Sequence, residues 1–324
     1  MKNSTDKLPK RYKWLVTGGR GFLGKEVCHK LASKQIEVVS VDKKPLQPNV
    51  SWEQVVMDIT SANVSELSKF HFDGIVHLAA LKSVQESLLF PEIYHSNNVQ
   101  MSEALLSMSI EMGVQTFIFV SSASVYKSSN HEISEESDLE PLSPYGQSKF
   151  EFEKRLLSAE IVSPSNIVIV RPFNIVGCNY FGEPSNSVVT KVLNSINQGI
   201  PFNQNSRTNL MDNTSLSPIR DYIDVSDVSE IISRIVSKCQ KEVLDSKITI
   251  NACTGVGHSV EEVIRKAELC SGEILIKSRS ELDPEEILIS IGSTVLLRKT
   301  VKIDQFRELE ESIGNEWSAI KDER

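Results

Sequence analysis

The sequence predicts an α/β fold in which a doubly wound parallel sheet carries helices on both faces and a smaller α/β lobe is interleaved with it. Three observations predict this fold. Short apolar runs alternate with segments of helical period from residue 14 onward, which is the rhythm of βαβ units. A glycine-rich turn joins the first run to the first helical segment. Beyond residue 178 the rhythm becomes irregular and rich in Asn, Ser and Pro, as expected of a region built from insertions.

Length and composition exclude several classes of protein. A chain of 324 residues can bury a sizeable core as one large domain or two modest ones. The net charge of −8 argues against binding the nucleic-acid backbone as the main task. Five widely spaced cysteines without a C-x-x-C pair suggest neither disulfides nor a metal site. Residues 1–13 lack the apolar region of a signal peptide, and no run reaches the ~20 apolar residues of a membrane helix. We expect a cytoplasmic protein without a metal, nucleic-acid or membrane partner.

Each expected element has a local signal. The strand-like runs are Trp14–Thr17, Ile36–Asp42, Gln54–Met57, Gly74–Leu78, Thr116–Val120, Asn166–Val170 and Ile248–Asn251. The expected helices include Phe22–Ser33, a long one around Asn98–Met112 and one that opens at Pro144. Ser143 is placed to cap the helix at Pro144, where a missing N–H costs nothing. A later helix should begin at Ser259, because Ser259 and Glu262 have the spacing of a capping box.

The glycine-rich turn predicts a dinucleotide site. Gly18, Gly21 and Gly24 follow the first strand at G-x-x-G-x-x-G spacing. Such glycines allow a tight turn and let the backbone approach a pyrophosphate at a helix N-terminus, where free N–H groups favour anions. Asp42 ends the second strand, where a carboxylate accepts hydrogen bonds from the adenosine ribose and repels a 2′-phosphate. NAD is therefore favoured, although the two lysines that follow Asp42 could hold the phosphate of NADP.

Asp58 and Ile59 follow the third predicted strand. A carboxylate at this position can contact the adenine amine. On spacing alone, a solvated aspartate at a strand end is an equal alternative.

The order of the segments predicts two interleaved lobes. We expect an NAD-binding Rossmann-type domain over residues 1–178, because the regular alternation ends there. Residues 221–256 should return to this domain, since they contain the strand-like run Ile248–Asn251. Residues 179–220 and 257–324 should form the substrate-binding lobe.

A tyrosine, a lysine and a serine form a candidate catalytic group. Tyr145 and Lys149 lie four residues apart, on one face of a predicted helix. A free tyrosine has a pKa near 10, so a base at pH 7 needs a pKa lower by roughly three units. The lysine and a positive nicotinamide ring could supply that shift. Ser122 follows the strand Thr116–Val120, at the edge where such sheets hold ligands, and is a candidate to donate or relay a proton. Taken alone, a Y-x-x-x-K pair is commonly a surface feature, and Ser124 could be a turn residue.

Together with these features, six blocks resemble the extended short-chain dehydrogenase/reductase superfamily and, within it, the UDP-glucose 4-epimerase family of nucleotide-sugar enzymes. The blocks are His77–Ser87, Tyr94–Val99, Phe117–Tyr126, Ser143–Lys149, Arg171–Asn174 and Ile219–Val225. The resemblance implies an isomerase that epimerises a UDP-sugar, uses NAD and supplies sugars for polysaccharide or glycan synthesis. It also implies a homodimer formed by long helices of each partner.

The resemblance implies a role for each residue that matches a family motif. The implied catalytic residues are Ser122, Tyr145 and Lys149. The implied NAD-binding residues are Gly18, Gly21, Phe22, Leu23, Gly24, Asp42, Asp58, Ile59, Leu78, Ala79, Ala80, Lys82, Asn97, Tyr145, Lys149 and Pro172. The implied substrate-binding residues are Lys82, Ser122, Ser124, Tyr145, Asn174, Asn186, Val188, Arg220 and Arg279. Elementary chemistry agrees for the two arginines, because a planar guanidinium makes paired hydrogen bonds to phosphate.

The implied reaction has two stages. Tyr145, helped by Ser122, removes the proton of the sugar 4-hydroxyl while a hydride passes from C4 to NAD; the 4-keto sugar then turns and takes the hydride back, so NAD can stay bound. Ala123 and Ser124 stand where dehydratase relatives carry an Asp-Glu pair, so 4,6-elimination lacks its proton donor. An NAD(P)H-dependent 4-keto reductase or dehydrogenase is the alternative, and a cofactor sensor on an inactive fold is a third. The segment Ser278–Thr300 departs from the family patterns, which leaves glucose, N-acetylhexosamine and uronic acid open as the sugar.

Overall fold

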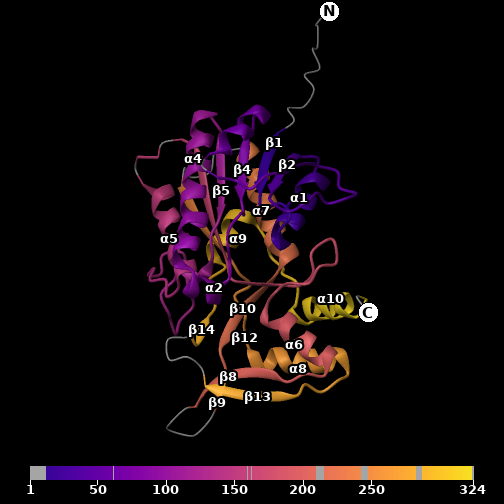
Figure 1. Ribbon diagram of the computed structural model, residues 1–324. Helices are drawn as coiled ribbons and strands as arrows, with labels where there is room; N and C mark the ends of the chain where they lie inside the picture. The colour runs from indigo at the N-terminus through magenta and orange to yellow at the C-terminus, as the bar shows by residue number, and fades with distance from the viewer. Residues whose placement is uncertain are drawn as a thin grey trace, which may run out of the picture.

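The fold consists of a large lobe around a parallel sheet and a smaller lobe beside it, seen at the top and bottom of Figure 1. The computed structural model describes residues 12–60, 62–158, 160–161, 163–208, 215–241, 247–281 and 287–322. Over these ranges, no helix is both long and apolar enough to cross a membrane. The same ranges contain no cluster of three or more His, Cys, Asp or Glu residues that could hold a metal ion.

Seven strands form the central sheet. They are β1 (Lys13–Thr17), β2 (Glu37–Asp42), β3 (Glu53–Val56), β4 (Gly74–His77), β5 (Thr116–Val120), β6 (Asn166–Pro172) and β11 (Lys247–Ala252). Their order in space is β3–β2–β1–β4–β5–β6–β11, and every neighbouring pair is parallel. The chain winds outward from β1 in both directions, so a crevice opens at the carboxyl ends of β1 and β4. The doubly wound fold and all seven predicted strands are confirmed, with boundaries that differ by at most two residues.

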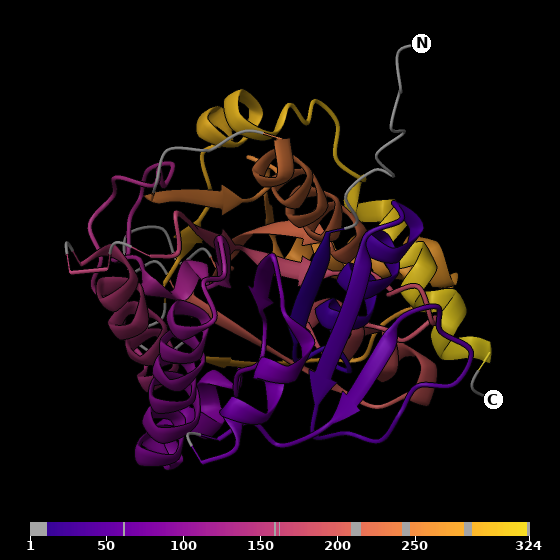
Figure 2. The same cartoon turned by 90° about the horizontal axis from the view of Figure 1, so that it is seen from above.

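Helices cover both faces of this sheet (Figure 2). The helical elements of this lobe are α1 (Phe22–Ser33), η1 (Val64–Phe70), α2 (Val84–Leu89), α3 (Pro91–His95), η2 (Ser96–Gln100), α4 (Met101–Glu111), η3 (Ala123–Val125), α5 (Pro144–Leu157), α7 (Val225–Lys241) and α9 (Val295–Val301). Alternate residues of β1 point to opposite faces. Trp14 and Val16 join the core formed with α1, α7 and α9, whereas Leu15 joins the core formed with α4 and α5.

The helix predicted around Asn98–Met112 differs from its prediction. It starts earlier, as α3, and passes through one π-helical turn, η2, before α4 begins. The amide of Asn98 lies in this turn and holds the backbone of Leu81, a contact distant in sequence. A π turn inserts one extra residue into a helix and is common at functional sites. We therefore attribute the π turn to the contact between Asn98 and Leu81 and not to the helix preference of the local sequence.

Two predicted helix starts are confirmed by their caps. The hydroxyl of Ser143 accepts a hydrogen bond from the Gly146 N–H at 3.1 Å, with Pro144 in the first turn of α5. The hydroxyl of Ser259 accepts from the Glu262 N–H at 3.1 Å, and the Glu262 carboxylate accepts from the Ser259 N–H at 2.8 Å. The second pair forms a complete capping box, so α8 begins where the sequence predicts.

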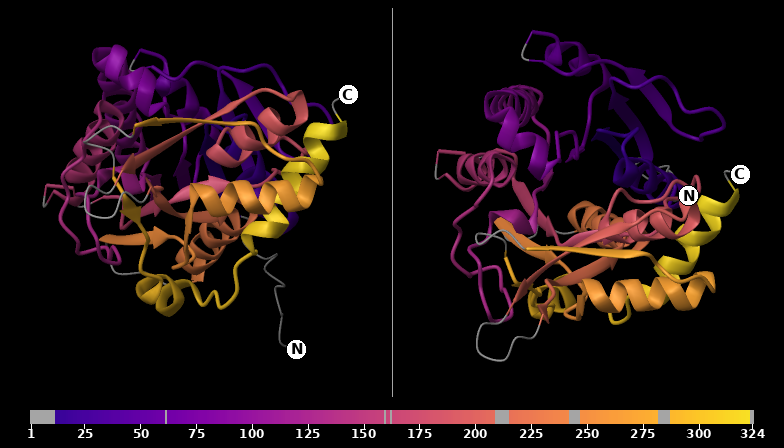
Figure 3. Two further views of the ribbon diagram at one scale, coloured as in Figure 1. Left: turned by 90° about the horizontal axis from the view of Figure 1, so that it is seen from below. Right: turned by 60° about the horizontal axis from the view of Figure 1, so that its bottom comes forward.

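The smaller lobe packs three helices against short strands (Figure 3). Its elements are β7 (Asn174–Val176), α6 (Val188–Gln198), β8 (Phe202–Thr208), β9 (Ser215–Leu216), β10 (Ile219–Asp224), β12 (Gly257–Ser259), α8 (Val260–Ser271), β13 (Lys277–Glu281), β14 (Ile289–Ser290) and α10 (Leu309–Asp322). Strand β10 pairs with β7, β12 and β14, and β8 pairs with β9 and β13. The chain crosses between the lobes repeatedly. Elements α7 and β11 return to the large lobe, and α9 later joins the core that α7 forms with α1. The assignment of residues 1–178 and 221–256 to one domain stays a prediction.

Candidate active site

A cleft of about 1470 Å³ runs from the carboxyl ends of the central strands to the small lobe. Its lining includes all the predicted site residues except Arg279. They are Gly18, Gly21, Phe22, Leu23, Gly24, Asp42, Asp58, Ile59, Leu78, Ala79, Ala80, Lys82, Asn97, Ser122, Ser124, Tyr145, Lys149, Pro172, Asn174, Asn186, Val188 and Arg220. The side chain of Arg279 lies outside the described part of the chain, and only its backbone pairing with Gln204 is known. The proposed role of Arg279 therefore stays a prediction.

The glycine-rich turn brings the start of α1 against the sheet. Gly18 has a φ of +69°, and a Cβ there would lie 2.8 Å from the backbone nitrogen of Ala79. A Cβ on Gly24 would overlap the carbonyl oxygen of Gly18. The N-cap of α1 is Gly21, which has no side chain to occupy the first amides of the helix. These amides belong to cleft-lining residues, so the turn fits a pyrophosphate at a helix N-terminus.

Asp42 is held in place at the end of β2. Its carboxylate accepts hydrogen bonds from the backbone N–H groups of Arg20 and Lys44, each at 3.0 Å. The guanidinium of Arg20 turns onto the following loop, where it donates to the carbonyl of Pro45 at 2.7 Å. Arg20 also lines the cleft. Sequence reasoning missed this residue, although it lies inside the glycine motif.

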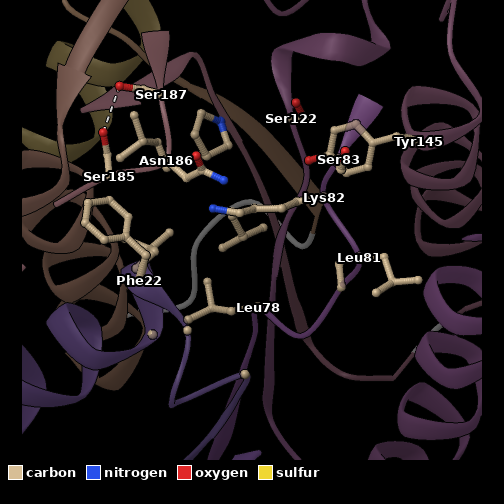
Figure 4. Close-up of a pocket in the computed structure, with 18 of the residues that line it drawn as sticks. Phe22, Leu78, Leu81, Lys82, Ser83, Ser122, Tyr145, Ser185, Asn186 and Ser187 are labelled. Atoms are coloured by element: carbon tan, nitrogen blue, oxygen red, sulfur yellow. Dashed lines mark hydrogen bonds between the residues drawn. The ribbon is translucent and has the colours of Figure 1, made fainter. Parts of the chain in front are cut away.

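The catalytic candidates meet where β5 ends and α5 begins. Ser122 lies beside Tyr145 (Figure 4), and its hydroxyl accepts a hydrogen bond from the Ser124 N–H at 3.1 Å. Burial raises the pKa of Tyr145, and the neighbouring Ser122 hydroxyl lowers it. Figure 4 shows Ser122 near the ring of Tyr145, beside the open space of the cleft. In this environment alone the phenol keeps its proton, so its use as a base requires a nearby positive charge.

Lys149 lies one helical turn beyond Tyr145. Its ammonium donates to the carbonyl of Val120 at 2.9 Å and stands 4.8 Å from the centre of the Phe119 ring. Burial lowers the pKa of Lys149 to about 7, against an opposing contribution from Glu153. A lysine with such a pKa can release or take up a proton near neutrality.

Asn98 positions the loop that carries Lys82, and sequence reasoning missed it. Its side-chain oxygen accepts from the Leu81 N–H at 2.8 Å, and its amide donates to the Leu81 carbonyl and to Ser148, both at 3.0 Å. Because Ser148 precedes Lys149 in α5, Asn98 joins the loop to the catalytic helix. Lys82 points across the cleft towards Asn186 in Figure 4, and burial lowers its pKa.

His77 belongs to the core of the large lobe. Its two ring nitrogens lie 2.7 Å from the hydroxyl of Thr17 and 2.8 Å from that of Ser102. Burial and the nearby Lys149 lower the pKa of His77 to about 3. The imidazole is therefore neutral and structural.

The far end of the cleft carries polar groups of the small lobe. The amide of Asn174 donates to the carbonyl of Asp221 at 3.0 Å, which links β7 to β10. The guanidinium of Arg220 donates to the carbonyls of Ile219 and Leu288, at 3.0 and 3.3 Å, and lines the cleft. These contacts hold a cation and an amide against the end of the cleft opposite the glycine turn. Together with the glycine turn, that arrangement suits two phosphate-bearing ligands, one held by each lobe.

Known proteins are similar to this chain in sequence. The UDP-glucose 4-epimerase of Caenorhabditis elegans is 29% identical over 289 residues, which cover 80% of this chain and 83% of the relative. The UDP-glucose 4-epimerase of Bacillus subtilis is 26% identical over 330 residues, 94% of this chain and 95% of the relative.

Solved structures extend the similarity to the whole fold. A UDP-glucose-4-epimerase structure from Stenotrophomonas maltophila, with bound NAD and formylated UDP-arabinopyranose, superposes with a TM-score of 0.87 at 25% identity, over 97% of this chain and 99% of that one. The NAD dependent epimerase/dehydratase family matches residues 14–251, well over half of the chain. With the glycine turn, the Tyr145–Lys149 pair and Ser122 in one cleft, this chain belongs to the NAD dependent epimerase/dehydratase family.

Proposed function

We propose that this protein is an NAD-dependent 4-epimerase of a UDP-sugar. One observation carries the proposal: Ser122, Tyr145 and Lys149 line the same cleft as the glycine-rich turn of the large lobe and Arg220 of the smaller lobe. The 4-epimerase relatives and the neighbour bound to NAD and a UDP-sugar analogue support it.

The described residues fit NAD. The turn at Gly18 and Gly24 leaves no room for a Cβ, and the α1 amides would hold the pyrophosphate. Asp42 would accept hydrogen bonds from the adenosine ribose, and Lys82 and Asn97 lie on the path towards Tyr145. When bound, NAD supplies a carrier that accepts a hydride from the substrate and can return it.

The chain's own residues would then move the proton. Tyr145 takes the proton of the sugar 4-hydroxyl, with Ser122 as relay. The cationic Lys149 and the positive ring of the bound cofactor lower the pKa of the phenol against the effect of burial. Arg220 and Asn174 hold the diphosphate of the sugar nucleotide, so the 4-keto sugar can turn about this anchor; Tyr145 then returns the proton to the 4-oxygen as the hydride returns to C4.

The residues after Ser122 favour epimerisation over elimination. Ala123 and Ser124 form the short helix η3, and the Ser124 hydroxyl lies 3.1 Å from that of Ser122. Neither carries a carboxyl group. A 4,6-elimination needs an acid to protonate the departing hydroxyl, and these two positions supply none.

The test measures sugar interconversion without added cofactor. The purified protein is analysed for NAD released on heat denaturation, then incubated with UDP-glucose, UDP-N-acetylglucosamine and UDP-glucuronic acid, with the C4 configuration followed by NMR. We expect interconversion of at least one sugar and NAD in the released fraction. Interconversion of none, together with reduction of added NAD one to one with formation of a 4-keto product, would identify the dehydrogenase or reductase instead.

We further propose that the enzyme is a cytoplasmic homodimer that supplies sugars for glycan synthesis. Helices α3 and α5 lie side by side in the large lobe, and Ile110 and Leu157 expose apolar side chains at the ends of α4 and α5. Two copies could pack these helices into a four-helix arrangement. The five cysteines are free thiols, which agrees with a reducing compartment.

A further inference from the structure

The segment 177–187 between β7 and α6 forms one wall of the cleft. Residues 183–188 line the cleft, and Asn186 and Val188 are the predicted substrate contacts among them. Figure 4 shows Asn186 pointing towards Lys82 across the open space, while the hydroxyls of Ser185 and Ser187 lie 2.8 Å from each other. Because the segment lacks regular structure over most of its length, other parts of the molecule must hold it in place.

A single buried carboxyl group on α10 holds two points of this wall and the helix that follows it. Glu316 has no exposed surface. Its Oε1 accepts hydrogen bonds from the Gly177 N–H at 2.6 Å and from the Ser185 hydroxyl at 2.7 Å. Its Oε2 lies 2.7 Å from the hydroxyl of Thr190, in the first turn of α6. The contacts thus reach the start of the segment, the residue before Asn186 and the helix that follows.

A protonated Glu316 accounts for two contacts of the Thr190 hydroxyl. The Thr190 hydroxyl contacts both Oε2 of Glu316 and the carbonyl of Ser185. It has only one proton to donate. If Glu316 donates from Oε2 to Thr190, then Thr190 donates to the Ser185 carbonyl and both contacts are hydrogen bonds. Burial raises the pKa of Glu316 to about 7, which agrees with this arrangement.

The same segment is held on its other side by the start of α1. The Tyr180 N–H donates to the carboxylate of Glu26 at 2.5 Å, and Lys25 forms an ion pair with Glu183. Both α1 residues lie just after the glycine-rich turn. The wall therefore stands between the cofactor turn and α10.

We propose that Glu316 is a positioning residue for the substrate: it holds the wall 177–187 so that Asn186 and Val188 meet the sugar nucleotide. This role rests on the proposed function, because it assigns the wall to the UDP-sugar side of the cleft. Glu316 itself does not line the cleft, so its effect passes through Gly177, Ser185 and Thr190. A residue with only a structural role would change stability and leave substrate affinity as it is.

The test compares Glu316→Leu with Glu316→Gln in the NAD-loaded enzyme. Leucine removes every hydrogen bond to the wall, whereas glutamine can accept from Gly177 and Ser185 and donate to Thr190. We expect Glu316→Leu to raise KM and the calorimetric Kd for the UDP-sugar roughly tenfold, with kcat changed less than about threefold. Glu316→Gln should stay within about threefold of wild type in both. The NAD content should be the same in all three proteins.

Two further variants make the result decisive. Glu310→Leu is the matched control, because Glu310 lies on the same helix and pairs with Lys266 of α8 instead of the wall; it should leave KM unchanged. Thr190→Val keeps the shape of the side chain and removes only its hydroxyl, so it should raise KM even where Glu316→Leu fails to fold.

Three outcomes would overturn the inference. The first is an unchanged Kd in Glu316→Leu and in Thr190→Val. The second is a Glu316→Gln variant as impaired as Glu316→Leu. The third is a wild type that binds no UDP-sugar, in which case the proposed function fails as well. A wild type that binds UDP-glucose but epimerises no sugar contradicts the proposed function alone, and the Kd comparison still decides the role of Glu316.

Discussion

At the scale of single residues, Tyr145 combines two opposing influences. Burial raises the pKa of its phenol, and the neighbouring Ser122 hydroxyl lowers it. The base therefore becomes effective only when a cation stands in the cleft.

Removing the phenol oxygen should stop the chemistry and leave the cofactor bound. We expect Tyr145→Phe to abolish sugar interconversion, because the ring still fills its buried place while the group that accepts the proton is gone. NMR of the C4 configuration and the NAD released by heat measure the two effects. Loss of bound NAD in this variant would mean that Tyr145 acts structurally.

Lys149 predicts a pH dependence of stability. Its folded pKa is about 7, whereas an unfolded lysine titrates near 10.4. Between these values the unfolded chain binds more protons, so the free energy of unfolding rises with pH, by up to about 1.4 kcal/mol per unit for one proton. Lysine burial is thus most destabilising below pH 7. In cofactor-free protein, the wild type should gain stability relative to Lys149→Met as pH rises from 6.5 to 9. Urea unfolding at each pH measures the free energy of unfolding of the two proteins. A difference between them that stays constant from pH 6.5 to 9 would contradict this prediction.

At the scale of elements, a buried ion pair joins β6 to α5. The guanidinium of Arg171 donates to both oxygens of Glu153, at 3.0 and 2.5 Å, and to the hydroxyl of Tyr126 at 2.8 Å. Both charged side chains are almost fully buried. The pair fixes the catalytic helix against the strand that ends at Pro172, so the orientation of Tyr145 depends on it.

Removing one partner of this ion pair should lower the free energy of unfolding more than replacing both partners with apolar residues. Arg171→Leu leaves the Glu153 carboxylate buried without its partner and should lower the free energy of unfolding by about 3–5 kcal/mol. Arg171→Leu combined with Glu153→Leu should recover much of this loss, because no buried charge remains. Denaturant unfolding measures both variants. Equal losses in the single and double variants would show that the Tyr126 and packing contacts, not the charges, hold the elements together.

Sequence patterns predicted those elements whose signal is local. The seven central strands are runs of apolar residues. The starts of α5 and α8 follow from capping hydrogen bonds between residues three positions apart. The glycine turn and the Tyr145–Lys149 pair could be found in the same way, because the function of each depends on the spacing of residues that are close in sequence. The π turn at Asn98 could not be predicted, because it depends on a contact with Leu81 seventeen positions away.

Contacts between distant segments explain the other residues that were missed. Glu316 reaches Gly177 across 139 positions, and no periodicity or motif marks such a pair. The orientation of Arg20 depends on where the loop after β2 returns. Both become visible only when distant segments are brought together in the folded chain.

At the scale of the whole molecule, the proposed dimer makes a direct prediction. Ile110→Glu combined with Leu157→Glu places two charges on the exposed ends of α4 and α5, and burying unpaired charges in an interface is costly. We expect the wild type to sediment as two chains and the double variant as one. Leu269→Glu, on the exposed side of α8, is the control that should stay dimeric. A monomeric wild type at micromolar concentration would refute the dimer.

The late position of β11 in the chain bears on how the protein is synthesised. Strand β6 ends at Pro172, but β11, its neighbour on the sheet's outer side, is completed only at Ala252. While the ribosome makes the residues in between, the newly made β6 presents an open edge that includes Ile167 and Ile169, and such edges favour aggregation. A fragment cut after residue 178 would keep that edge permanently. The nascent enzyme should therefore depend on chaperones during this interval, and expression as separate halves should yield insoluble protein.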